Sequence, residues 1–229
     1  MSHILIVNPN SDQNCTAGIA ASVAPFDPNG TMRTVTLAAG PLAILSWRDW
    51  HGVVEPLCQL VEREAADVYV IACASDPGIE AVRAVTPRPV LGVFRCAVAS
   101  AVAQAERFGV IAIVEASKAR HMAALRAMGL ETRLAGEVAL NVSMDALLDP
   151  AAARTRLIAA GRELVANGAG TVVLGCTGMA HHRAAVEHAI GVPVIEPCQA
   201  AAVQAILATR TAEFFRASVS LEGSITTNA

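Results

Sequence analysis

Two cysteines, Cys73 and Cys176, occupy similar positions in the sequence and have side chains that can transfer protons. Each follows a short apolar run typical of a buried strand and precedes a polar turn and a helical segment. A helix start offers unpaired N–H groups and the positive end of the helix dipole, so we expect the pKa of both thiols to be lowered. Two thiols facing one carbon from opposite sides can invert it, since one removes a proton and the other delivers one. The alternative is that each is a small buried apolar residue.

The two cysteines belong to an internal repeat. The segments DVYVIACASDPGIEAVRAVTPRPVLGV and GTVVLGCTGMAHHRAAVEHAIGVPVIEP both read as strand, cysteine, polar turn, helix, Pro-Val and strand. The cysteines are 103 residues apart, and Pro89 and Pro193 are 104 apart. ILIVNPNS is also similar to VIAIVEAS, which places Ser11 106 residues before Ser117. The repeat predicts two similar lobes related by a pseudo-twofold axis, with the active site in the cleft between them.

The elements that must position these residues are short apolar runs alternating with alanine-rich helical segments. This alternation favours an α/β fold in which each lobe is a parallel sheet flanked by helices, with ligands at the carboxyl ends of the strands. We expect lobe 1 at residues 1–97, completed by about 199–229, and lobe 2 at 98–198. The expected strands are residues 4–7, 68–72, 90–94, 110–114, 172–174 and 192–195, and the expected helix stops are Gly109, Gly129, Gly168 and Gly191.

Composition excludes several classes of protein. The 229 residues are 54% hydrophobic and 16% charged, with a net charge of −3 and scattered basic residues, so we expect no nucleic-acid partner. Apolar runs are far shorter than the roughly 20 residues of a membrane span, and the N-terminus does not read as a signal peptide. We therefore expect a soluble cytoplasmic protein with no membrane partner. Dinucleotide, phosphate-loop and serine-hydrolase motifs do not occur, and neither does a CxxC pair.

The sequence resembles the aspartate/glutamate/hydantoin racemase superfamily, and within it the hydantoin-racemase-like branch that includes allantoin racemases. The resemblance spans nearly the whole chain and rests on ILIVNPNS, AAGPLAI, IACASDPGIEAVR and VVLGCTGMA. It implies a cofactor-independent racemase or epimerase, with no metal, whose catalytic pair is Cys73 and Cys176. The alternatives of the same fold are a maleate-type isomerase and an arylmalonate-type decarboxylase, although the intact cysteine pair argues against the decarboxylase. A non-catalytic small-molecule-binding protein is an alternative of another class.

Polar residues beside the cysteines and in the first turn are candidates for substrate binding. Ser75 and Thr177 could donate to a developing enolate oxygen or cap their helices, and Gly178 could let the substrate approach the backbone. Asp76 reads as the cap of the helix that follows it rather than as a base. The turn after the first strand could hold a carboxylate or carbonyl oxygen, or could be an Asx turn in which Asn10 or Ser11 caps the next helix. Its residues are Asn8, Pro9, Asn10 and Ser11.

Two features depart from the family pattern. Arg95 follows an expected strand where relatives of the hydantoin type commonly carry Glu, so it could attract an anionic substrate or could lie on the surface beside a loop. The segment SWRDWHG brings together aromatic and basic side chains that could line or cover the cleft, or form a contact in the homo-oligomer that we expect. These side chains are Trp47, Arg48, Trp50 and His51.

The remaining sulfur and imidazole groups read as structural. Cys15, Cys58 and Cys198 lie in or beside expected helices and indicate packing, whereas Cys96 lies at an expected strand end and could imitate a catalytic thiol near the cleft. His181 could tune the Cys176 thiolate, but the histidine spacing after Cys176 does not form a metal site. The partner that we expect is therefore a small-molecule substrate.

Overall fold

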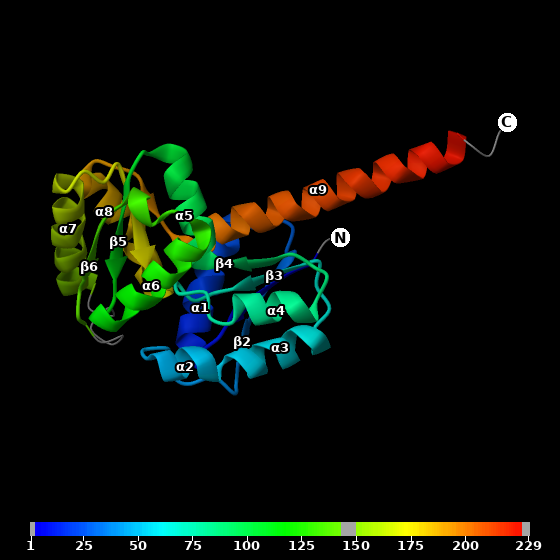
Figure 1. Cartoon of the computed structure of the whole chain (residues 1–229), viewed down its shortest axis with the longest axis horizontal. Coiled ribbons are helices and arrows are strands. Elements are labelled where there is room, and N and C mark those ends of the chain that lie inside the picture. Colours follow the sequence, from blue (N-terminus) through cyan, green and yellow to red (C-terminus); the bar gives the residue numbers. More distant parts are fainter. Residues whose placement is uncertain (1–2, 143–149, 226–229) are drawn as a thin grey trace.

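The computed structural model describes residues 3–142 and 150–225, with side chains described for 3–142 and 151–211. It contains two four-stranded parallel sheets flanked by helices, as the sequence predicts (Figure 1). In the first sheet the spatial order is β2-β1-β3-β4, and in the second it is β6-β5-β7-β8. The second order repeats the first with every strand number raised by four, so the internal repeat is visible in the topology. The strands are β1 (Ile4–Asn8), β2 (Met32–Thr36), β3 (Val68–Ile71), β4 (Val90–Gly92), β5 (Phe108–Ala112), β6 (Leu134–Ala139), β7 (Thr171–Gly175) and β8 (Val194–Ile195).

Helices cover both faces of each sheet. On the first sheet, α1 (Gln13–Val23) and α9 (Pro197–Ile225) pack on one face, while α3 (Val54–Arg63) and α4 (Ile79–Val85) pack on the other. On the second sheet, α7 (Pro150–Ala166) and α8 (Arg183–Ile190) lie opposite α6 (Glu115–Met128). Because the central strands are buried on both faces, their sequences are continuous apolar runs.

The helix α5 (Val93–Gln104) joins the two halves. Its Val93 and Cys96 side chains pack with the first sheet, and Phe94 and Val98 pack with the second. The expected lobe boundary at residues 97 and 98 falls inside this helix, so the division of the chain into lobes stays a prediction. Figure 1 shows the later part of α9 extending away from both sheets. None of the described helices combines the length and apolar character that a membrane span requires.

Several expected elements are wrong at their ends. The strand expected at residues 90–94 stops at Gly92, and Phe94 lies in α5, because the Asp76 carboxylate accepts backbone N–H groups in the first turn of that helix. Gly109 lies inside β5 rather than after a helix, since α5 ends at Gln104. Gly129 and Gly191 do end their helices, with φ of 67° and 74° in the left-handed region that favours glycine.

Three elements of the structure were not predicted from the sequence. The edge strands β2 and β6 are only half-buried, so MRTVT and LAGEVA do not form the apolar runs that reveal a central strand. The segment SWRDWHG is not a loop but carries the helix α2 (Trp47–Gly52). This helix begins with a capping box, in which the side chains of Ser46 and Asp49 each accept a hydrogen bond from the backbone N–H of the other residue.

Candidate active site

Cys73 and Cys176 line the same pocket, which lies at the carboxyl ends of the central strands of both sheets. Cys176 directly follows β7, and Cys73 lies two residues after the equivalent strand β3. The other residues that line the pocket come from the end of β7, from the turns after β1, β3, β5 and β7, from α1 and α6, and from the segment before α2. They are Asn10, Asp12, Cys15, residues 42–45, Ala72, Ala74, Ser75, Ile113, Ser117, Arg120, His121, Gly175 and Thr177.

Burial raises the pKa of both thiols, so the lowered values that we expected are wrong. The pKa of Cys176 reaches about 12, although the backbone N–H of Gly178 opposes this rise. Burial also raises the pKa of Cys73, against hydrogen bonds from the hydroxyl and the backbone of Ser75. Neither thiol lies at the start of an α-helix, because α4 begins only at Ile79 and the helix η4 (Thr177–His182) is a short 3₁₀ helix. The loss of hydration therefore outweighs the local N–H groups.

The turn that carries Cys73 is fixed by hydrogen bonds on both sides. The Cys73 Sγ lies 3.5 Å from the Ser75 Oγ, and the indole Nε1 of Trp50 donates to the Ser75 carbonyl at 3.0 Å. Asp76 follows with φ of 46°, in the left-handed region. The fully buried Asp76 carboxylate accepts from the N–H groups of Phe94 and Arg95 at 2.9 Å. Asp76 thus caps α5 and not, as we expected, the helix that directly follows it.

The structure does not support the anion-binding role that we considered for Arg95. Its guanidinium lies 3.2 Å from the Asp76 carboxylate and 2.6 Å from the Glu80 carboxylate, so two acidic side chains neutralise it. Arg95 is also not among the described residues that line the pocket. It is equally not a free surface residue, because its side chain is only 16% exposed.

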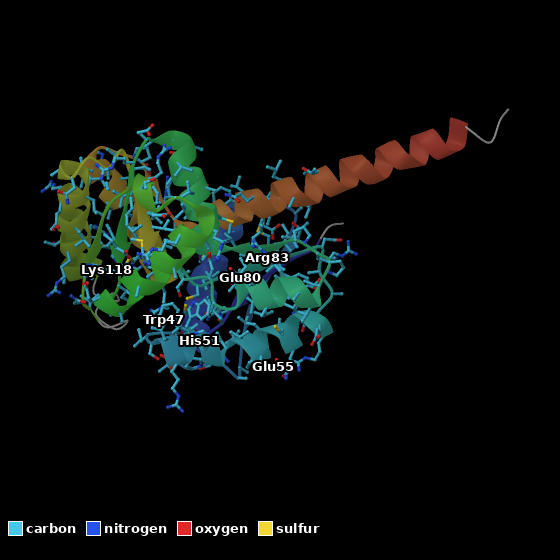
Figure 2. All side chains as sticks on the ribbon, viewed as in Figure 1. Trp47, His51, Glu55, Glu80, Arg83 and Lys118 are labelled. Atoms are coloured by element: carbon cyan, nitrogen blue, oxygen red, sulfur yellow. The ribbon has the colours of Figure 1, made fainter. Side chains whose placement is uncertain are left out.

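The helix α2 supports the pocket from outside its wall. Trp47 and His51 stack with ring centroids 5.8 Å apart, and both are labelled on α2 in Figure 2. Among the described residues these rings do not line the pocket, whereas residues 42–45, which precede α2, do. Trp50 acts on the site through the Ser75 carbonyl. Of the two roles that we considered for these rings, the described lining does not support the first, and a role in oligomer contacts stays a prediction.

The turn after β1 is held by the amide side chain of Asn8. This buried amide donates to the Asn10 Oδ1 at 2.8 Å, to the Asp12 carbonyl at 3.1 Å and to the Thr16 Oγ1 at 2.9 Å. Asp12 caps α1 by accepting from the backbone of Asn14, so neither Asn10 nor Ser11 is the cap that we considered. Asn8 therefore shapes the turn rather than the pocket surface.

Of the other candidates in this turn, one lines the pocket and two do not. Asn10 lines the pocket, and its Nδ2 lies 3.6 Å from the Cys15 Sγ. Pro9 and Ser11 are not among the described lining residues. The Ser11 backbone N–H donates to the Pro41 carbonyl at 2.9 Å, which holds the turn against the segment that leads to residues 42–45.

The turn after β7 also brings polar groups to the pocket. Thr177 lines the pocket with its Oγ1 3.8 Å from the Cys15 Sγ, so these two residues connect the two halves of the chain. Gly178 lies outside the described lining, and its backbone N–H reaches the Cys176 thiol instead of a bound molecule. Gly175 is required here, because a Cβ at this position would lie 2.6 Å from the Ile111 carbonyl oxygen.

The remaining cysteines are placed differently from one another. Cys15 packs against the hydrophobic core of the first sheet, as expected, and it also lines the pocket. Cys58 and Cys198 are buried in hydrophobic clusters, as expected. Cys96 lies on α5 and not at a strand end, and it is buried away from the described pocket lining. His181 is likewise absent from that lining.

Arg120 and His121 are functional candidates that the sequence reasoning missed. Both lie on α6, line the pocket and are almost fully buried. The His121 Nδ1 lies 2.5 Å from the Glu137 Oε1, and its ring stacks on Phe94 at 4.6 Å. Ser117, Arg120 and His121 are spaced i, i+3 and i+4, which places them on one helix face. A polar face on a helix that covers a buried sheet was the signal that could have found them.

The described residues contain no group of three or more His, Cys, Asp or Glu side chains that could hold a metal ion. The functional groups that line the pocket are thiols, hydroxyls, an amide, the Asp12 carboxylate, a guanidinium and an imidazole. These groups can move protons and can bind oxygen atoms that carry or develop negative charge.

Comparisons with known proteins agree on one family. A model of the Asp/Glu/Hydantoin racemase family matches residues 4–205. A hydantoin racemase from Paenarthrobacter aurescens is 34% identical over 205 residues, which cover 86% of this chain and 87% of the relative. A solved allantoin racemase from Klebsiella pneumoniae is 26% identical with a TM-score of 0.81, over 91% of this chain and 89% of that one. The fold also occurs in a maleate cis-trans isomerase from Nocardia farcinica, at 17% identity and a TM-score of 0.71 over 91% and 93% of the two chains. The fold alone thus fits more than one reaction.

Proposed function

The chain belongs to the Asp/Glu/hydantoin racemase family, and we propose that it interconverts the enantiomers of a 5-substituted hydantoin, allantoin or a related amino-acid derivative. In the proposed reaction Cys73 and Cys176 remove and return the proton on a carbon adjacent to a carbonyl. The observation that carries the proposal is that both thiols line one pocket at equivalent positions of two sheets with the same strand order. The relatives named hydantoin and allantoin racemase support the substrate class.

The proposed mechanism moves one proton in each direction. A thiolate takes the proton from the carbon, and the electron pair of the C–H bond passes into an enolate with negative charge on the carbonyl oxygen. The opposite thiol then protonates the other face of the carbon, which leaves the two sulfurs with exchanged protonation states. Which of Cys73 and Cys176 begins as the thiolate depends on the enantiomer that binds. Because the carbonyl of the substrate itself accepts the electron pair, the proposal includes no cofactor.

The two sulfurs differ in the groups that stabilise their thiolates. Ser75 donates to the Cys73 sulfur and the positive charge of Arg120 favours its thiolate, whereas Cys176 has the Gly178 N–H. Because burial raises both pKa values, each thiolate is a minor species near neutral pH but a strong base once formed. We propose that Asn10, Ser75 and Thr177 hold the substrate, since these polar side chains line the pocket around the sulfurs.

The test is proton NMR in deuterated buffer, with circular dichroism on the same samples. The panel contains single enantiomers of substituted hydantoins, allantoin, aspartate and glutamate, together with maleate and an arylmalonate. We expect the α-proton signal and the optical signal of a hydantoin or of allantoin to disappear together. Conversion of maleate to fumarate, or loss of carbon dioxide from the arylmalonate, with no change in the hydantoins would contradict the proposal.

The matched controls separate the pocket thiols from the other sulfur atoms. Cys58→Ala removes a thiol from the core of the first half, so racemisation should persist as long as the variant folds. The double variant Cys73→Ser/Cys176→Ser should be inactive with a normal far-ultraviolet spectrum. Activity in the double variant would assign the reaction to other groups of the pocket.

A further inference from the structure

Arg120 is a buried cation in the wall of the pocket whose hydrogen-bonding capacity is only partly used. Its residue is 3% exposed, and it lines the pocket beside both halves of the chain. The Nη1 donates to the Leu45 carbonyl at 3.1 Å, and the Nη2 donates to the Ser117 Oγ at 3.2 Å. The buried Nε has no hydrogen-bond partner. A guanidinium has five N–H donors, so these two neutral oxygens leave it substantially unsatisfied.

The charge of Arg120 is also not neutralised at close range. Within the described part of the chain, no carboxylate lies within 4 Å of its guanidinium. Asp49 acts on it only from a greater distance, and that carboxylate is occupied by the backbone and hydroxyl of Ser46. The Glu137 carboxylate contacts His121, the neighbour of Arg120 in the sequence.

Arg95 shows that the same molecule pairs another buried arginine with carboxylates. Arg95 is also mostly buried, but Asp76 and Glu80 both contact its guanidinium. A buried charge is costly unless it is paired, and the fold pairs Arg95 while leaving Arg120 to face the pocket. The Asp12 carboxylate also lines the pocket, but it caps α1 and does not contact the guanidinium, so Arg120 leaves a positive charge that a bound anion can neutralise.

We propose that Arg120 binds an ionised carboxylate of the substrate, so that the preferred substrates are hydantoins with a carboxylate side chain, such as those derived from aspartate and glutamate. This inference rests on the proposed racemase function and names its substrate class. The planar guanidinium matches a carboxylate, which accepts two parallel N–H bonds. Arg120, Cys73 and Cys176 line the same pocket, so a carboxylate held by Arg120 keeps the attached ring beside the two sulfurs.

The test compares a charged substrate with its neutral isostere. Racemisation of hydantoin-5-acetic acid and of its side-chain amide is measured for the unmodified protein, Arg120→Gln, Arg120→Lys and Arg126→Gln. Arg126 is an exposed residue on the same helix, so its variant makes the same charge change outside the pocket.

We expect kcat/KM of the unmodified protein to favour the acid about tenfold or more. Arg120→Gln should lower kcat/KM for the acid by about 10- to 100-fold more than for the amide, mainly through KM, because the lost charge beside Cys73 affects both substrates alike. Arg120→Lys should restore part of the loss, and Arg126→Gln should change neither substrate.

Two results would overturn the inference. A preference of the unmodified protein for the amide would show that the pocket does not select a carboxylate. An equal loss for acid and amide in Arg120→Gln would show that Arg120 serves the Cys73 thiolate or the Leu45 contact rather than the substrate. Urea unfolding of Arg120→Gln, compared with Arg120→Lys, identifies a variant that has lost the contact between the two halves.

A binding measurement separates this inference from the proposed function. Calorimetry with succinate, which carries carboxylates but cannot be racemised, should show binding that weakens by about 10- to 100-fold in Arg120→Gln and not in Arg126→Gln. Succinate binding that depends on Arg120, in a protein that racemises no hydantoin, would support the anion site and contradict the racemase proposal. If the protein racemises neutral hydantoins and Arg120→Gln does not change succinate binding, the racemase proposal is supported and the anion site is contradicted.

Discussion

Alkylation of Cys176 by iodoacetamide should be slow near neutral pH and should rise steeply as the pH increases. Burial raises the pKa of this thiol from 9.0 to about 12. Only the thiolate reacts, so at pH 8 roughly 1 in 10,000 molecules carries the reactive form, against about 1 in 10 for an unshifted thiol. The expected rate at pH 8 is therefore about a thousandfold below that of an ordinary accessible thiol, and it should increase about tenfold per pH unit from 7 to 10.

Peptide mass spectrometry after timed alkylation measures Cys73 and Cys176 separately in one sample. Because the proposed reaction also needs a thiolate, kcat/KM should rise over the same alkaline range. The Cys73 rate should fall further in Arg120→Gln, since the guanidinium favours the Cys73 thiolate. A Cys176 rate that is fast at pH 7 and reaches a plateau below pH 9 would refute the reasoning, because it would show that local N–H groups outweigh burial.

Three further variants and one control variant test the scaffold of the site. Gly175→Ala places a Cβ 2.6 Å from a β5 carbonyl oxygen and should lower the free energy of urea unfolding by about 1–3 kcal/mol; Gly18→Ala, with open space around its Cβ, should instead stabilise α1 by up to about 1 kcal/mol. Asp76→Asn removes a buried partner of Arg95 and should lower the free energy of unfolding by about 3 kcal/mol in the same assay, and an unchanged midpoint would contradict this. Trp50→Phe removes the indole donor from the turn after β3, so the free energy of unfolding should fall by about 1 kcal/mol and kcat/KM should decrease. Unchanged kinetics would show that α2 does not influence the site.

The sheet cores and the position of the cysteine pair follow from the sequence because central strands are read directly from their composition. A strand buried on both faces is a continuous apolar run, and Cys176 stands at the end of such a run while Cys73 follows another closely. The repeat spacing then predicts equivalent strands in two sheets, which the strand orders show. The edge strands β2 and β6 escape this reasoning because a half-buried strand mixes polar and apolar residues.

The polar contacts of the site depend on tertiary structure that local patterns do not encode. Asp76 precedes one helix but caps another, 18 residues later in the chain, because the left-handed backbone at Asp76 and the close approach of Gly92 direct its carboxylate to α5. The same contact occupies Arg95, so the basic residue noticed in the sequence is not available to a substrate. The thiol pKa values depend on how much of each sulfur is buried, a quantity that the helix-start pattern does not contain.

The two-base assignment is tested most directly by the separate variants Cys73→Ser and Cys176→Ser, with each enantiomer of the substrate identified in the NMR panel. Racemisation is followed by circular dichroism, and exchange of the α-proton for deuterium is followed by NMR. We predict that both variants lose racemisation, while each retains exchange with at most one enantiomer, because one base remains on one face of the carbon. Full racemase activity in Cys176→Ser would contradict the two-cysteine mechanism.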